Sequence, residues 1–288
     1  MINNYFTTKL FAINLFLQQN DCRYITTLIL GLCIGSFLNV VIYRLPIMLN
    51  TKWLEHNQSN NSSSKISLFW PSSFCPRCQN KLKWWMNLPL LSFIILKGRC
   101  FFCKKKISLL YPSLELTTAL FFTAIAYNYH DLFHLLSYSV FFSVLLVLSI
   151  IDWQTMLLPD EITLPLLWLG LLLNLYGYLS GSLLSAVTGA IFGYSFLAII
   201  YWLFKLFAHK EGLGFGDFKL LAAIGAWLGQ KYIIPIALLS SLFAIFYALL
   251  MFLIAKKSLK VAIPFGPFLA LAAICCILFV NYIEPISL

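Results

Sequence analysis

The stretch Gly212-Leu213-Gly214-Phe215-Gly216-Asp217 separates two apolar segments of this 288-residue chain. Glycines at alternate positions free the backbone to turn and let another chain approach it closely. Asp217 follows them and opens the apolar segment 218–236, and a carboxylate is favoured at the start of a helix by the helix dipole. Taken alone, the stretch is compatible both with a glycine-rich loop that ends in an acidic helix cap and with a functional site.

The composition sets the class of protein. Hydrophobic residues make up 61% of the chain, charged residues make up 10%, and the mean hydropathy is +0.86. Soluble domains carry about 25% charged residues. We therefore expect an integral membrane protein.

Apolar segments recur along the chain at lengths suited to a bilayer, which a helix crosses with about 20 apolar residues. They fall at 26–46, 109–129, 132–151, 162–179, 183–207, 218–236, 237–255 and 261–283. The expected fold is an all-α polytopic membrane protein with about eight transmembrane helices. The expected division is into an N-terminal segment with the first helix (1–46), a polar domain (47–108) and a transmembrane core (109–288).

The basic residues are distributed unevenly across the expected topology. Every Lys and Arg except Lys9, Arg23 and Lys231 falls on the side that holds segment 47–108. Basic residues accumulate on the cytoplasmic side of membrane proteins, so we place this segment and Asp217 in the cytoplasm and the protein in the inner membrane. The net charge of +10 then reflects topology and does not indicate a nucleic-acid partner.

Two Cys-x-x-Cys pairs lie in the polar segment. Their arrangement is typical of a structural zinc site with four thiolate ligands, and the surrounding basic residues favour thiolates. Disulfide bonds are the alternative, and a cytoplasmic location argues against them. We expect structural Zn²⁺, because four cysteines leave no coordination position for water. The expected ligands are Cys75, Cys78, Cys100 and Cys103.

A second acidic cluster follows the expected third span. Asp152 lies at the end of that span, where ionisable residues are costly and usually functional. Asp160 and Glu161 follow a proline and are typical of a helix N-cap and first turn. Capping therefore accounts for Asp160 and Glu161 but not for Asp152.

The expected topology brings Asp152 and Asp217 to the same cytoplasmic interface. Two neighbouring carboxylates can activate a water molecule when one is ionised as a base and the other is protonated as an acid, and such a pair titrates as one unit. The chain has neither a His-Glu-x-x-His zinc-protease motif nor a Gly-x-Ser-x-Gly nucleophile elbow. We therefore predict that the two aspartates are catalytic.

Together these residues resemble the bacterial type IV prepilin leader peptidases, which also act as N-methyltransferases. The resemblance covers nearly the whole chain and includes both cysteine pairs, Asp152 and the glycine-aspartate stretch. Further matching segments are 35–46, Trp84-Trp85, 87–92, Tyr111-Pro112 with Glu115-Leu116, Leu158-Pro159-Asp160 and 264–268. Each motif alone is weak evidence for this family, but the occurrence of all of them in the family's order is specific evidence for it.

The resemblance implies an aspartic endopeptidase of the glycine-x-glycine-aspartate type, with Asp152 and Asp217 as its catalytic pair. Its substrates would be type IV prepilins and the pseudopilins of type II secretion, cleaved after a glycine at the cytoplasmic edge of their hydrophobic helix. The new N-terminal residue would then be methylated with S-adenosylmethionine. The residues implied to support catalysis are Gly212, Gly214, Gly216 and Lys219.

The methyl-donor site has no glycine-rich sequence signature in this chain. Gly98 and Glu115 are only weak candidates, because a turn glycine and a buried helix carboxylate are the simpler explanations of these residues. Three alternatives stay open from the sequence. A peptidase-only relative would lack the cysteines, a presenilin-like protease would carry its partner aspartate deeper in a span, and an ion-coupled transporter would be supported by internal repeats.

Overall fold

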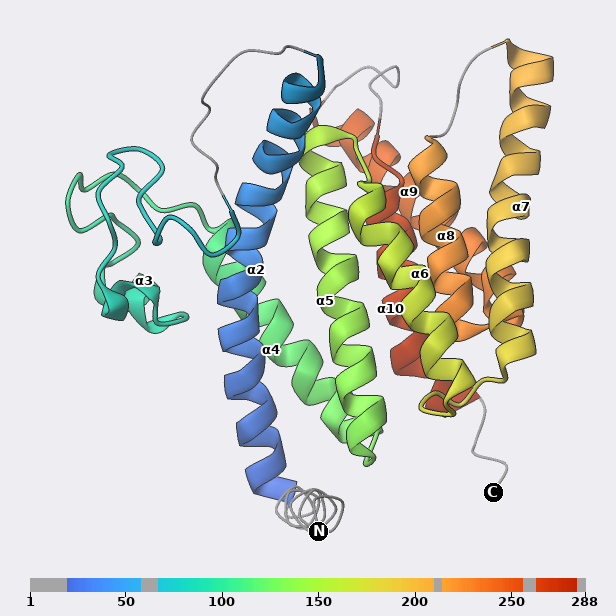
Figure 1. The fold of residues 1–288 in the computed structure, drawn as a ribbon, viewed down its shortest axis with the longest axis horizontal. Helices are drawn as coiled ribbons and strands as arrows, with labels where there is room; N and C mark the ends of the chain where they lie inside the picture. The colour runs from blue at the N-terminus through green and yellow to red at the C-terminus, as the bar shows by residue number, and fades with distance from the viewer. Residues whose placement is uncertain (1–19, 58–66, 210–213, 256–262, 284–288) are drawn as a thin grey trace. The chain divides into compact units, whose positions relative to one another are not determined.

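A computed structural model describes residues 20–57, 67–209, 214–255 and 263–283 (Figure 1). These residues fold into helices without named strands, so the predicted all-α class is confirmed. The described chain divides into two compact units, one ending at Leu135 and the other beginning at Leu136. The predicted domain boundaries at 46 and 108 stay predictions.

The helices follow the apolar pattern of the sequence. The first unit holds α2 (Asn20–Asn57), the short helices η1 (Trp84–Asn87) and α3 (Leu91–Ile95), and α4 (Leu110–Asn128). The second unit holds most of α5 (Leu132–Thr155), then α6 (Asp160–Leu175), α7 (Leu183–Ala208), α8 (Phe215–Leu228), η2 (Gln230–Tyr232), α9 (Ile233–Ala255) and α10 (Gly266–Ile283).

Four described helices are long and apolar enough to cross a membrane. Their apolar stretches are Cys22–Thr51, Leu132–Thr155, Leu183–Phe207 and Gln230–Ile254, and Gly266–Phe279 is a shorter apolar helix. Large apolar side chains such as Phe207 and Ile254 are exposed on these helices, as lipid-facing residues are. A polytopic membrane protein is thereby supported, while the count of eight spans stays a prediction.

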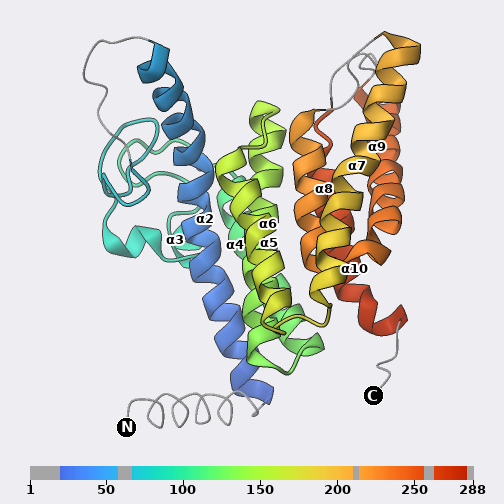
Figure 2. The same ribbon diagram turned by 45° about the vertical axis from the view of Figure 1, so that its right-hand side comes forward.

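In the first unit, α2 and α4 lie side by side (Figures 1 and 2) because two glycines of α2 face the α4 backbone. A Cβ atom on Gly31 would lie 2.6 Å from the Cα of Ala119, and one on Gly35 would lie 2.7 Å from the Cα of Glu115. Small residues four apart allow such close helix packing in membranes. The side-chain amide of Asn39 adds a cross-helix hydrogen bond to the Tyr111 carbonyl, at 3.2 Å.

In the second unit, α8 is enclosed by its neighbours and is buried around most of its circumference. Glycines again set the distance between helices: a Cβ on Gly225 would lie 2.3 Å from the Gly189 carbonyl oxygen of α7. On another face, the Trp227 indole N–H donates to the Leu166 carbonyl of α6 at 2.8 Å. This packing fixes α8, and with it the position of Asp217.

Candidate active site and cysteine cluster

Asp217 lies in the first turn of α8, as the sequence predicts. Gly214 is the N-cap, and its backbone N–H donates to the Asp217 carboxylate at 3.2 Å. The carboxylate therefore satisfies one of the N–H groups that a helix N-terminus leaves free, and it lies where the helix dipole favours negative charge. Its side chain is 7% exposed. Gly212 lies outside the described residues, so its predicted role stays a prediction.

Asp152 lies near the C-terminal end of α5 and is 5% exposed. Its Oδ2 accepts a hydrogen bond of 3.0 Å from the backbone N–H of Gly266, the first residue of α10. A Cβ atom at position 266 would lie 2.7 Å from the same oxygen, so only glycine lets the backbone come this close. In the sequence, segment 264–268 stands out only by its resemblance to the leader peptidases. Nothing in the sequence predicts the contact of Gly266 with Asp152.

The two aspartates belong to the same unit, Asp152 near the end of α5 and Asp217 in the first turn of α8. Figure 1 shows that α5 ends, and α6 and α8 begin, at the same end of this unit. Asp152 is close enough to Asp217 to act on it electrostatically. Leu158 lies beside both backbone segments: hypothetical Cβ atoms on Gly216 and Gly266 would lie 2.7 Å and 3.3 Å from its side-chain carbons. Two carboxylates from distant parts of the chain thus share one buried environment.

An ion pair links the two helices that begin beside this pair. The Lys219 ammonium lies 2.7 Å from a carboxylate oxygen of Asp160. Asp160 and Glu161 are in the first turn of α6, as predicted, although the N-cap is Pro159, one residue before the predicted cap. Lys219 therefore holds α8 to α6, a role that the sequence did not reveal.

The predicted cysteines converge: the four sulfur atoms lie within 4.8 Å of one another. A tetrahedral Zn²⁺ with Zn–S distances of about 2.3 Å places its sulfurs about 3.8 Å apart. The donor set and its spacing therefore fit one ion. Four thiolates would complete its coordination shell and leave no place for a reacting water.

The two cysteine loops have matching local structure. In the first, the Gln79 N–H donates to the Cys75 carbonyl; in the second, the Lys104 N–H donates to the Cys100 carbonyl. Gln79 and Lys104 both have a left-handed backbone, with φ of 57° and 56°. Each loop therefore reverses directly after its second cysteine and presents both thiols on one side, as a metal-binding knuckle requires.

Neighbouring groups already favour ionisation of one of these thiols. Burial opposes ionisation of Cys100, but hydrogen bonds from the backbone N–H groups of Cys103 and Phe102 and from the thiols of Cys103 and Cys75 together outweigh it and lower the pKa of Cys100 to about 7. The pKa of Cys78 rises to about 11, because burial and hydrogen bonding with the other thiols outweigh the lowering effect of the Asn80 backbone. A thiolate at Cys100 is thus stabilised by backbone N–H groups and by the thiols of Cys103 and Cys75. A bound metal ion would deprotonate the remaining thiols as well.

Both weak candidates for the methyl-donor site lie in the first unit. Glu115 is buried in α4, and its Oε2 accepts the Leu90 N–H at 2.8 Å. Gly98 has a φ of +67°, and a Cβ there would lie 3.0 Å from the Phe93 ring. Gly98 is therefore needed for its turn, while Glu115 borders a cavity described below.

The fold and these two sites define a polytopic membrane protein with a buried aspartate pair and a four-cysteine cluster of metal-binding geometry. Residues 29–129 match the family model of the bacterial Peptidase A24 N-terminal domain, and residues 139–249 match that of the type IV leader peptidase family. The chain belongs to the type IV leader peptidase family.

Curated relatives agree with this assignment. The chain is 46% identical to a protein of Pectobacterium carotovorum over 218 residues, which is 74% of this chain and 78% of the relative. It is 48% identical to one of Aeromonas hydrophila over 75% of this chain and 77% of the relative. A protein of Neisseria gonorrhoeae is 42% identical over 77% and 80%. Each is named prepilin leader peptidase/N-methyltransferase, and no solved structure matches the chain.

Proposed function

We propose that this protein is a bifunctional enzyme that cleaves the leader peptides of type IV prepilins and pseudopilins and N-methylates the residue exposed by cleavage. Membership of the leader peptidase family supports both activities. The observation that carries the peptidase mechanism is the buried pair Asp152 and Asp217, each fixed by a backbone N–H from a different segment.

The two aspartates suit hydrolysis of a peptide bond. The ionised member takes a proton from water as the water oxygen attacks the scissile carbonyl carbon. The protonated member donates to the carbonyl oxygen, and a proton then passes to the leaving nitrogen as the C–N bond breaks. The products are the leader carboxylate and a pilin with a free N-terminal amine, and the carboxyl pair returns to its singly protonated state.

The glycines beside Asp217 suit an extended substrate. Gly214 precedes α8 and has an exposed, extended backbone, with φ of −82° and ψ of 147°. A peptide could therefore approach the chain there without meeting a side chain. We place this surface on the cytoplasmic side of the inner membrane, because the basic residues of the sequence gather on that side.

The cysteine domain suits the second activity. Cys75, Cys78, Cys100 and Cys103 would hold one structural Zn²⁺ that ties the two knuckles together. S-adenosylmethionine would supply the methyl group to the new N-terminal amine. The presence of all four cysteines favours the bifunctional enzyme over a peptidase-only relative.

Mass spectrometry of a purified prepilin incubated with the purified protein and S-adenosylmethionine tests the proposal. We expect the leader to be removed after a glycine and the mature chain to gain 14 Da, the mass of one added CH₂ group. A product that keeps its leader would refute the peptidase function. A cleaved product without added mass would refute the methyltransferase function alone.

A further inference from the structure

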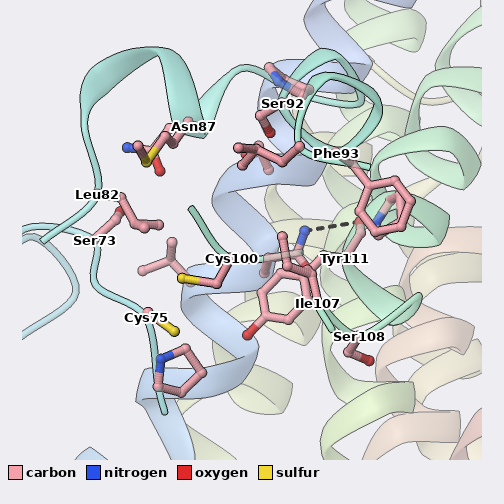
Figure 3. Close-up of a pocket in the computed structure, with 18 of the residues that line it drawn as sticks. Ser73, Cys75, Leu82, Asn87, Ser92, Phe93, Cys100, Ile107, Ser108 and Tyr111 are labelled. Carbon is pink, nitrogen blue, oxygen red and sulfur yellow. Dashed lines mark hydrogen bonds between the residues drawn. The ribbon is translucent and has the colours of Figure 1, made fainter. Parts of the chain in front are cut away.

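The first unit contains a cavity of about 790 Å³. Ligand pockets for small molecules occupy about 300–1,000 Å³, so the space suits a molecule of the size of a nucleoside with an amino-acid side arm. Its lining comes from α2, both cysteine loops, the segment around α3 and the start of α4. Figure 3 shows part of it, including Ser73, Cys75, Asn87, Ser92, Phe93, Cys100 and Tyr111.

Glu115 supplies a buried carboxylate to this cavity. It lines the cavity and is 8% exposed. Its Oε2 accepts the Leu90 N–H at 2.8 Å, and Ser36 of α2 lines the same cavity. The close packing of Gly35 against the Glu115 backbone fixes its position. A carboxylate held in this way can accept hydrogen bonds from the hydroxyl groups of a ribose, as acidic residues of dinucleotide-binding proteins do.

The remaining lining suits the other parts of a methyl donor. Aromatic rings of Phe93, Phe101 and Tyr111 border the cavity and offer apolar surface for a purine base. Basic residues border it as well and can pair with a carboxylate, namely Arg77, Lys105 and Lys106. S-adenosylmethionine contains a purine, a ribose and an amino-acid carboxylate, so each kind of lining group has a counterpart in it.

We infer that this cavity is the methyl-donor site, with Glu115 binding the ribose hydroxyl groups and Ser92 in contact with the donor. The inference rests on the proposed methyltransferase function and adds the place where the donor binds. The inference also links the cysteine cluster to donor binding, because Cys75 and Cys100 form part of the cavity wall. A metal ion that fixes the knuckles would also fix this wall.

Glu115 also has a structural role that the test must separate from ligand binding. Leu90 has a left-handed backbone, with φ of 56°, and caps α3 while donating its N–H to Glu115. Loss of the carboxylate oxygen could therefore disturb α3. Glu115→Gln keeps an oxygen acceptor for Leu90, and it changes mainly the charge that a ribose diol would meet.

Binding of S-adenosylhomocysteine to the full-length, zinc-loaded protein in detergent provides the test, with calorimetry as the readout. Ser92→Trp places an indole in the cavity and should weaken binding by more than about 30-fold. Ile94→Trp is the matched control, because Ile94 lies on the same short helix, is 68% exposed and does not line the cavity. Glu115→Gln should weaken binding by about tenfold, the loss expected for one charge-assisted hydrogen bond.

Zinc content and thermal unfolding of each variant show whether it is folded. Wild-type affinity in folded Ser92→Trp and Glu115→Gln proteins would overturn the inference and place the donor elsewhere, while methylation by the wild type would leave the proposed function intact. A wild-type protein that neither binds the probe nor methylates pilin would refute the methyltransferase function itself. Equal loss of binding in Ile94→Trp would also overturn the inference, because the effect would then not come from the cavity.

Discussion

Gly266→Ala should slow leader cleavage without loosening the fold. The added Cβ would lie 2.7 Å from the Asp152 Oδ2, whereas ordinary contacts of this kind begin at 3.4 Å, so the carboxylate must retreat by about 0.7 Å. Misplacing a catalytic group by about 1 Å can cost about 100-fold in rate. We therefore expect kcat to fall by roughly 20- to 100-fold. Alanine is the better helix former, so α10 itself should not be weakened.

The assay is cleavage of a purified prepilin over a range of concentrations, so that kcat and KM are separated. KM should change little, because Gly266 contacts a carboxylate that is proposed to react with the substrate and not to bind it. Leu271→Ala is the control, since Leu271 is exposed on the same helix. A folded Gly266→Ala enzyme with kcat within twofold of wild type would refute the positioning of Asp152 by this backbone.

Three further changes test other parts of the structure. Cys75→Ser should release the metal ion from the purified protein and abolish methylation while cleavage persists; metal retained at the wild-type level by atomic absorption would contradict the four-cysteine site. Gly31→Leu should lower stability by about 1–3 kcal/mol, because its side chain meets the Ala119 backbone; an unchanged thermal midpoint would argue against the α2–α4 packing. Gly170→Ala should lower the stability by a similar amount, because its Cβ would lie 2.5 Å from the Trp227 ring. The midpoint of thermal unfolding in detergent measures it, and no shift would exclude that contact.

Much of the fold follows from patterns that are local in sequence. The all-α class needs only the recurring apolar segments, and the first-turn positions of Asp217 and Asp160 follow from glycine or proline followed by an acid. The cysteine cluster could be predicted because a Cys-x-x-Cys spacing already places two thiols on one side of a turn. In each case, neighbours in the sequence determine the geometry.

Contacts between distant segments could not be predicted in this way. The donation from Gly266 to Asp152 joins residues 114 positions apart, and the Lys219–Asp160 pair joins residues 59 apart. Nothing in the sequence around Gly266 or Lys219 indicates its partner, because the packing of the helices determines which groups come into contact. The cavity beside Glu115 is likewise formed by several segments at once, so the sequence offered Glu115 only as a weak candidate.

Cleavage by Asp152→Asn and Asp217→Asn tests the central claim most directly, because each change keeps the side chain's shape and removes its acid–base function. Both variants can be checked for folding by methylation of a synthetic, already cleaved pilin peptide, which requires no peptidase step. We expect each to methylate this peptide normally and to cleave prepilin roughly 100- to 10,000-fold more slowly than wild type. Near-normal prepilin cleavage by either variant would contradict the aspartate-pair mechanism.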